Sequence, residues 1–101
     1  MTASQLHFTA QFENDAIDAW WWIATHDPRA ADRLLEKVYR RCRLLVSHPL
    51  AGPARPDIDP HCRMLVIAPC LVLYRVEDTT VTLVRLLDGR RHISGSDFSE
   101  G

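Results

Sequence analysis

The clearest pattern of apolar and polar positions lies in the last third of the chain. Residues 63–76 and 81–87 form two apolar runs rich in β-branched side chains, and a short polar break at 77–80 separates them. Such runs around a polar turn predict a β-hairpin. The first run holds two strand-like segments, 64–68 and 71–76. A cationic cluster at 88–93 follows directly, so we expect a positively charged site at one end of a sheet.

The first half of the chain carries one alternating pattern and two helical patterns. Alternation over residues 6–12 predicts a short strand with one buried face. Apolar residues spaced by three and four predict a first helix from about 13 to 26. Asp27 and Pro28 suit a helix start, so a second helix should run from there to about 47.

The order β-α-α-β-β-β predicts an α+β fold in which a helical hairpin packs on an antiparallel sheet. A chain of 101 residues is long enough for one domain, 1–101. The tail from about 94 is rich in serine, glycine and acidic residues, and we expect it to be disordered. The predicted core residues are Trp20, Leu34, Leu35, Val38, Cys42, Val72, Tyr74 and Val84.

Three consecutive tryptophans stand in the first helical pattern. Successive helical residues point about 100° apart, so the three side chains cannot all face one core. Trp20 is the best core candidate. Trp21 and Trp22 either pack against the second helix or form a surface that binds a partner protein.

The predicted sheet has apolar side chains on both faces. Val72 and Tyr74 would lie on one face, and Leu71 and Leu73 on the other. A sheet with helices on one side only should alternate more cleanly between apolar and polar residues. Something therefore covers the second face, either a partner chain or the C-terminal tail.

The charges are unevenly distributed although the net charge is only −1. Residues 29–91 hold 12 basic and 7 acidic side chains, and 11 of the 12 basic residues are arginine. Arginine forms bidentate contacts with carboxylate and phosphate, which favours an acidic partner surface. The pI of about 6.5 is far below the values typical of nucleic-acid-binding domains.

Cysteine and histidine usage gives no sign of a metal site or a cofactor. The three cysteines are odd in number and lack a C-x-x-C pair, so we expect reduced, buried thiols.

No apolar run approaches the ~20 residues that span a bilayer. The N-terminus has no signal-peptide pattern, which makes a cytoplasmic location the expectation.

Four short motifs occur in a characteristic order. Pro49-Leu50-Ala51-Gly52 is a P-x-x-G turn, Arg63 precedes the next strand, Tyr74-Arg75-Val76 ends a strand, and the segment 86–92 (LLDGRRH) closes the last one. In this order the chain resembles the ParE branch of the RelE/ParE toxin superfamily of bacterial toxin–antitoxin modules. The resemblance covers about residues 6–93, and its specificity comes from the order and spacing of the motifs.

The resemblance implies the toxin component of a type II toxin–antitoxin module. A ParE-like toxin inhibits DNA gyrase by protein binding and is neutralised by a cognate antitoxin in a toxin–antitoxin hetero-oligomer. One alternative is a RelE-like, ribosome-dependent mRNA endoribonuclease. Another is a degenerate toxin fold that acts only as an antitoxin-binding or autoregulatory partner. For the toxin alone we expect no membrane association and no direct nucleic-acid binding.

Two positions depart from the family pattern. The closing histidine of the family is Asp88 here, and its closing aspartate is His92, so acid and imidazole are exchanged around the matching Arg91. If Arg91 bridges Asp88, its role is to hold the strand end. Otherwise Arg91 contacts the target.

The choice between gyrase binding and RNA cleavage depends on cationic side chains. RNA cleavage needs groups that activate the 2′-hydroxyl and stabilise the phosphorane. The middle strands are apolar instead, and no tyrosine follows Arg91. The remaining candidates for such chemistry are Arg63, Arg85, Arg90, Arg91 and His92.

These considerations predict two surfaces. The target-binding residues are Arg63, Arg90, Arg91 and His92, of which Arg63, Arg91 and His92 would be catalytic in an RNase. The antitoxin-binding residues are Trp21, Trp22, Leu71 and Leu73.

Overall fold

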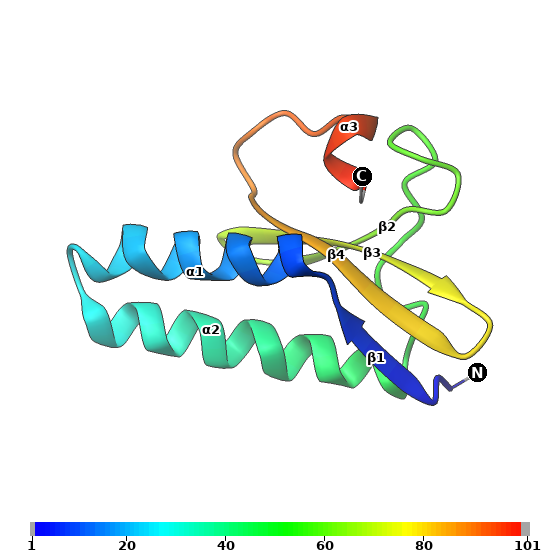
Figure 1. The fold of residues 1–101 in the computed structure, drawn as a ribbon, viewed down its shortest axis with the longest axis horizontal. Coiled ribbons are helices and arrows are strands. Elements are labelled where there is room, and N and C mark those ends of the chain that lie inside the picture. The colour runs from blue at the N-terminus through cyan, green and yellow to red at the C-terminus, as the bar shows by residue number, and fades with distance from the viewer. Residues whose placement is uncertain (1, 100–101) are drawn as a thin grey trace.

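A computed structural model describes residues 2–99 of the chain. Figure 1 shows two long helices lying side by side against a twisted sheet, with a short C-terminal helix on the other side of that sheet. The elements in chain order are β1 (Gln5–Phe8), α1 (Ala10–Ala24), α2 (Pro28–Arg43), the 3-10 helix η1 (Leu44–Val46), β2 (Arg63–Ile67), β3 (Cys70–Glu77), β4 (Thr80–Asp88) and α3 (Gly95–Phe98).

The sheet has the strand order β1-β4-β3-β2. Strands β2, β3 and β4 pair antiparallel, as predicted. Strand β1 runs parallel to β4, with Leu6 opposite Val81, so the prediction of a purely antiparallel sheet was wrong. Periodicity identifies a strand but not the direction of its neighbour, and β1 pairs with a strand more than seventy residues away. The α+β class and the predicted order of strands and long helices are confirmed.

The first strand is shorter than predicted because Thr9 starts the helix. Its side-chain oxygen accepts a hydrogen bond from the Phe12 amide at 3.0 Å and donates one to the Val84 carbonyl at 2.9 Å. This cap begins α1 at Ala10, and the apolar alternation at 10 and 12 belongs to the helix. Asp27 caps α2 as predicted, accepting from the amides of Arg29 and Ala30.

The helical hairpin covers one face of the sheet and forms the larger core with it. Leu34, Val38 and Cys42 of α2 meet Val72 and Tyr74 of β3 there, and all five are buried. Val84 is also buried, on the opposite face of the sheet. Six of the eight predicted core residues are therefore confirmed.

Trp20 and Leu35, the other two predicted core residues, are only half-buried. The Trp20 indole nitrogen donates to Asp32 Oδ1 at 2.8 Å. This hydrogen bond joins the two helices at their surface. Trp20 stays there because its indole N–H needs a polar partner, and the apolar core offers none.

The second face of the sheet is covered by the chain itself. Phe98 of α3 and Ile58 of the long connector pack on Leu73, Val84 and Leu87, and each of the five is less than a tenth exposed. The prediction of a disordered tail from about 94 was therefore wrong for residues 94–99. Ser94 and Asp97 form a capping box that starts α3, so the polar composition of this segment serves a helix. Glu100 and Gly101 lie outside the described residues.

The P-x-x-G turn, Tyr74 and Arg63 form one structural unit. The Tyr74 hydroxyl donates to the Pro49 carbonyl at 2.8 Å and accepts from the Gly52 amide at 2.9 Å. Arg63 Nε donates to the Gly52 carbonyl at 2.6 Å, and its Nη2 donates to the Leu50 carbonyl at 3.1 Å. A Cβ at position 52 would lie 2.7 Å from the Met64 carbonyl oxygen, so only glycine fits this turn.

All three cysteines are free and buried, as predicted. Burial raises the pKa of Cys42 to about 12 and that of Cys62 to about 11. Burial also raises the pKa of Cys70. These thiols are packing groups that stay protonated at neutral pH.

Candidate functional site

A partly buried ion pair joins α1 to β4 beside the end of the sheet. Arg85 Nε donates to Asp15 Oδ2 at 2.7 Å, and Arg85 Nη2 donates to Asp15 Oδ1 at 3.1 Å. The Leu86 amide also donates to Asp15 Oδ2, at 3.0 Å. The hydrogen bond to Asp15 raises the pKa of Arg85. Because the two hydrogen bonds between Arg85 and Asp15 leave both side chains little rotational freedom, the pair fixes α1 in place on β4.

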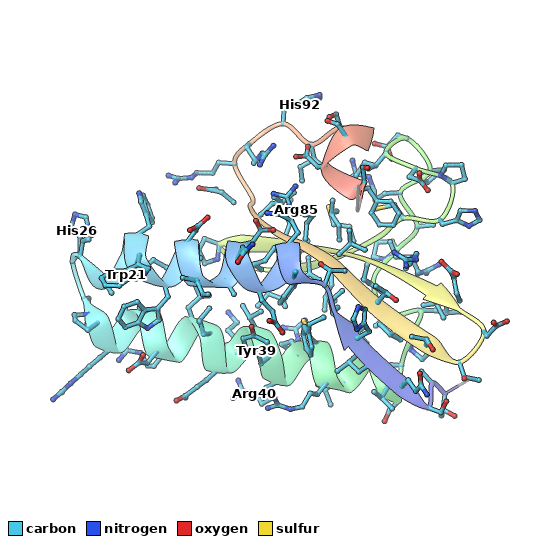
Figure 2. All side chains as sticks on the ribbon, viewed as in Figure 1. Trp21, His26, Tyr39, Arg40, Arg85 and His92 are labelled. Atoms are coloured by element: carbon cyan, nitrogen blue, oxygen red, sulfur yellow. The ribbon has the colours of Figure 1, made fainter. Side chains whose placement is uncertain are left out.

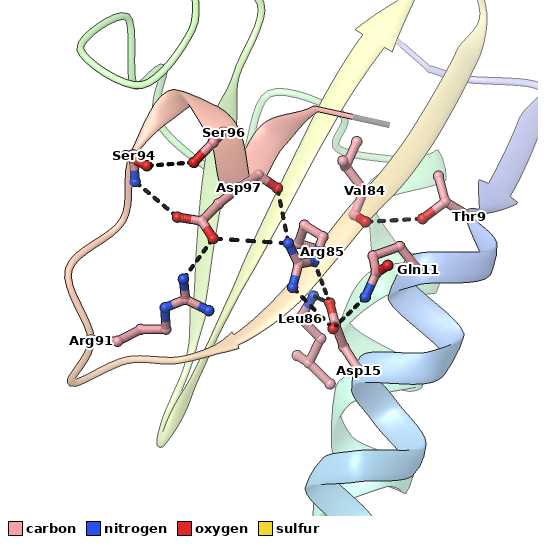
Figure 3. A network of polar contacts seen from close by, with 10 residues as sticks. All are labelled: Thr9, Gln11, Asp15, Val84, Arg85, Leu86, Arg91, Ser94, Ser96 and Asp97. Carbon is pink, nitrogen blue, oxygen red and sulfur yellow. Dashed lines mark hydrogen bonds and ion pairs between the residues drawn. The ribbon is translucent and has the colours of Figure 1, made fainter. Parts of the chain in front are cut away.

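The same network extends to the C-terminal helix through Asp97. Figure 3 shows Asp97 between Arg85 and Arg91, with Ser94 on its other side. Arg91 Nη2 donates to Asp97 Oδ1 at 2.6 Å, and Arg85 Nη1 lies 3.8 Å from the same oxygen. The Ser94 amide donates to Asp97 Oδ2 at 3.0 Å. One carboxylate thus holds α3, β4 and the segment after β4 together.

A pocket of about 460 Å³ opens beside this network, between α1 and the end of β4. We call it the α1–β4 pocket. Its walls are largely apolar, and charged side chains from α1 and from the segment after β4 lie around them. The lining residues are Asp15, Asp18, Ala19, Trp22, Ile23, Pro69, Cys70, Arg85, Leu86, Leu87, Asp88, Arg90 and Arg91.

Trp22 and Arg90 face each other across this pocket. The Arg90 guanidinium carbon lies 6.0 Å from the centre of the Trp22 ring, which is within the range of a cation–π contact. Trp22 is 65% exposed. Arg90 also forms a bidentate pair with Asp88, at 3.2 and 2.9 Å, and this pair lowers the pKa of Asp88 to about 2.

The structure separates the predicted target-binding residues. Arg90 and Arg91 line the pocket together, but Arg63 does not. In the sheet register, Arg63 of β2 lies opposite Tyr74 of β3, whereas Asp88, at the end of β4, lies opposite Cys70 of β3. Tyr74 and Cys70 are four residues apart, so Arg63 is ~13 Å along the strand direction from the end of β4. Because Arg63 also holds the P-x-x-G turn, the prediction that it clusters with Arg90 and Arg91 was wrong.

His92 is exposed and is not among the residues that line the pocket. Figure 2 shows its side chain projecting outward from the segment after β4, away from Arg85. The carboxylate partner of Arg91 is Asp97, and Asp88 pairs with Arg90 instead. The hypothesis that Arg91 bridges Asp88 through its side chain was therefore wrong.

The predicted antitoxin-binding residues also divide into two groups. Trp21 and Trp22 are 63% and 65% exposed, and Ile17, one helical turn before Trp21, is 54% exposed. Leu71 is half-buried. Leu73 is completely buried under α3 and the connector, so it cannot contact a partner in this structure.

Charge pairing limits the chemistry that the pocket supports. Its three arginines are each bonded to an aspartate of this chain. No histidine is among the lining residues. Within residues 2–99, no group of three or more His, Cys, Asp or Glu side chains is placed to hold a metal ion. The pocket offers an apolar wall and fixed ion pairs, a combination suited to recognising a surface of another molecule.

Sequence patterns missed Asp15 and Asp97, the two carboxylates that organise the site. Asp15 stands near the start of the first predicted helix, where an acidic residue ordinarily only favours the helix N-terminus, so the pattern gives no sign of its partner Arg85. The serine at 94 and the acid three residues later form a capping-box pattern, which could have revealed α3 and with it the position of Asp97.

Fold and pocket together define a small α+β domain with a concave, partly charged surface at one end of its sheet. The model of the family described as "ParE toxin of type II toxin-antitoxin system, parDE" matches residues 6–93. The chain belongs to this family.

One curated relative is Toxin ParE3 of Caulobacter vibrioides, which is 35% identical over 60 residues. That alignment covers 59% of this chain and 57% of the relative, so it spans little more than half of either protein. A solved structure described as the chromosomal ParDE TA system from P. aeruginosa matches with a TM-score of 0.72 and 18% identity. The match covers 86% of this chain and 96% of that one, and it supports the fold.

None of the helices in the described part of the chain is long and apolar enough to cross a membrane.

Proposed function

We propose that this ParE-family toxin acts by binding DNA gyrase and that a cognate antitoxin neutralises it by binding the same domain. The observation that favours binding over RNA cleavage is the pairing of all three pocket arginines with aspartates. A developing phosphorane needs cationic groups that are not already neutralised. A protein partner needs an apolar surface bordered by oriented charges, which this pocket has.

The target-binding surface in this proposal is the α1–β4 pocket with Arg90 and Arg91, and exposed His92 lies next to them in the chain. Arg90 is the central contact, because its side chain is 75% exposed and lies over the Trp22 ring. Arg63 is excluded from this surface, since its guanidinium donates to carbonyls of the P-x-x-G turn.

The antitoxin-binding surface in this proposal is the outward face of α1. Ile17, Trp21 and Trp22 are large apolar residues that are each more than half exposed. Exposed aromatic groups of this kind mark protein interfaces. Leu71 and Leu73 lie on the sheet face opposite the helices, so neither belongs to this surface: Leu71 is half-buried there and Leu73 is covered by the chain itself.

Inducing the chain alone in bacterial cells tests the proposed target. We expect an SOS response and DNA breaks, with intact mRNA, because a poisoned gyrase damages DNA. The variant His92→Gln keeps a polar side chain and removes the titratable imidazole. An RNase that used His92 as acid or base would lose ~10²–10⁴-fold in rate in this variant, whereas gyrase inhibition should change little. Rapid translation arrest with cut mRNA, abolished in His92→Gln, would contradict the gyrase proposal.

Pull-down with the product of the adjacent gene tests the antitoxin surface. Trp21→Ala and Trp22→Ala should each weaken antitoxin binding by ~2 kcal/mol or more, which is the loss typical of truncating a hot-spot residue. The control is Leu50→Ala, which removes an exposed apolar side chain from the connector, away from α1. Equal capture of all variants would exclude this face of α1.

A further inference from the structure

The cationic side chains of α2 differ from the other arginines of the chain. Arg55, Arg75, Arg85, Arg90 and Arg91 each pair with a carboxylate, and Arg63 is bonded to backbone carbonyls. Within residues 2–99, none of the six basic residues of α2 is in an ion pair. These residues are Arg29, Arg33, Lys37, Arg40, Arg41 and Arg43.

Acidic residues of α2 do not neutralise this charge. The helix has only two, Asp32 and Glu36. Both are exposed, and Glu36 lies on the outward side between Arg33 and Arg40, so together they offset two of the six positive charges and leave a surplus of four. Six basic residues against two acidic ones leave α2 strongly positive, although the whole chain has a net charge of −1. The average charge therefore conceals a local positive field on one helix.

The outward face of α2 presents this charge as a ridge. Arg29, Arg33 and Arg40 are exposed and point away from the buried side of the helix, where Ala31 and Val38 lie. Figure 2 shows Arg40 on the outer side of α2, away from the sheet. From Arg29 to Arg40 the ridge extends ~16 Å along the helix axis.

The ridge lacks the apolar groups that a protein partner would need. All exposed residues between positions 29 and 43 are charged, and the one exposed apolar side chain next to them is Leu44, one helical turn after Arg40. Protein interfaces depend on a central apolar or aromatic anchor, and the outward face of α1 offers Ile17, Trp21 and Trp22 for that purpose. Binding to a phosphate backbone needs only positive charge and donors, which is what α2 offers.

We propose that the outward face of α2 binds the phosphate backbone of duplex DNA without sequence preference, which replaces the expectation from the overall charge that the toxin alone does not bind nucleic acid. The major groove of B-DNA and its bordering phosphates admit a straight helix, whereas the major groove of duplex RNA is too deep and narrow. Single strands are held by aromatic stacking, and the exposed part of this ridge has no aromatic residue. This binding site is separate from the α1–β4 pocket and does not depend on the protein target.

Fluorescence anisotropy with the purified full chain and a labelled duplex of about 20 base pairs tests this proposal. With about three phosphate contacts, one for each of Arg29, Arg33 and Arg40, we expect log affinity to fall against log salt with a slope of about −2.7. Raising the salt from about 50 to about 200 mM should then weaken binding ~40-fold.

Variants of the ridge identify the surface involved. Arg33→Gln and Arg40→Gln should each weaken binding ~10-fold at about 50 mM salt and reduce the slope by about one. The matched control is Arg55→Gln, which changes the net charge equally but removes an arginine already paired with Asp57. It should leave both affinity and slope unchanged.

Several outcomes would overturn the proposal. One is the absence of duplex binding at about 50 mM salt, and another is an equal loss in Arg55→Gln and Arg33→Gln. Tighter binding of a single strand, of duplex RNA or of a polyglutamate peptide of matching charge would assign the ridge to a different anion. Because gyrase is absent from these measurements, their failure would leave the proposed protein target untouched.

Discussion

The arginines at the end of the sheet and those on α2 use the same side chain in two different ways. Around the α1–β4 pocket, Arg85, Arg90 and Arg91 are each held by an aspartate, and Arg85 is largely buried. On α2, Arg33 and Arg40 are exposed and are in no ion pair within residues 2–99. An ion pair with an aspartate fixes the position of an arginine side chain and cancels its charge. An exposed arginine without such a partner keeps its positive field, which can attract an anion from a distance. The number of basic residues therefore says little until their partners are known.

The largest difference between the two groups should appear in stability. Asp15→Ala should lower the free energy of unfolding by ~3 kcal/mol, because Arg85 and the Leu86 amide would lose their acceptor in a mostly buried place. Urea unfolding measures this change. The control is Asp57→Ala, which breaks an exposed ion pair and should leave the urea midpoint nearly unchanged.

A double variant sharpens this first prediction. Asp15→Ala combined with Arg85→Met removes both charges and restores apolar volume, so part of the stability lost in Asp15→Ala should return. If Asp15→Ala unfolds at the wild-type urea concentration, the Asp15–Arg85 pair does not hold α1 to the sheet.

The next effect concerns the cover of the second sheet face. Phe98→Ala should lower the free energy of unfolding by ~3 kcal/mol, because Phe98 is 7% exposed and packs in one cluster with Leu73 and Leu87. Removing residues 94–101 should expose Leu73 and increase binding of a hydrophobic dye. Unchanged stability and dye binding would show that the tail does not cover this face in solution.

Within the pocket itself, Arg91 and Arg90 should behave differently. Arg91→Ala should lower both stability and target binding, since Arg91 holds Asp97 of α3 at 2.6 Å. Arg90→Ala should spare stability, because its pair with Asp88 is exposed, and should weaken target binding ~10-fold or more. Thermal unfolding together with a binding titration separates the two outcomes. Equal losses of stability in both variants would remove the distinction.

The smallest effect on stability is expected on α2. Arg33→Gln and Arg40→Gln should each change the free energy of unfolding by less than ~0.5 kcal/mol, because neither side chain has an ion-pair partner to lose. Urea unfolding tests this as well. A loss above ~1 kcal/mol would mean that these arginines have structural contacts in solution.

The order of the elements could be predicted because local patterns encode it. Apolar spacing identified both long helices. The family motifs pointed to Tyr74, Gly52 and Arg63, and the structure joins these three residues in one hydrogen-bonded turn. The same three residues show why the target site was harder to predict. A motif match marks Arg63 as distinctive, but only its contacts with carbonyls show that it serves the fold.

The remaining errors involve contacts between segments distant in the chain. The parallel pairing of β1 with β4 has no signature in either strand. The pairs Asp15–Arg85 and Arg91–Asp97 depend on how α1 and α3 dock on the sheet. Apolar residues on both sheet faces correctly required a second cover, and the connector and α3 supply it in place of a partner chain.

The most direct measurement of the central claim is a side-by-side assay of the purified chain against DNA gyrase and against ribosome-bound mRNA. We predict inhibition of gyrase supercoiling with the mRNA left intact. Arg90→Ala should weaken inhibition ~10-fold or more, and Arg55→Ala, the control at an exposed ion pair outside the pocket, should inhibit as the wild type does. Cleavage of the mRNA with gyrase activity unaffected would contradict the account.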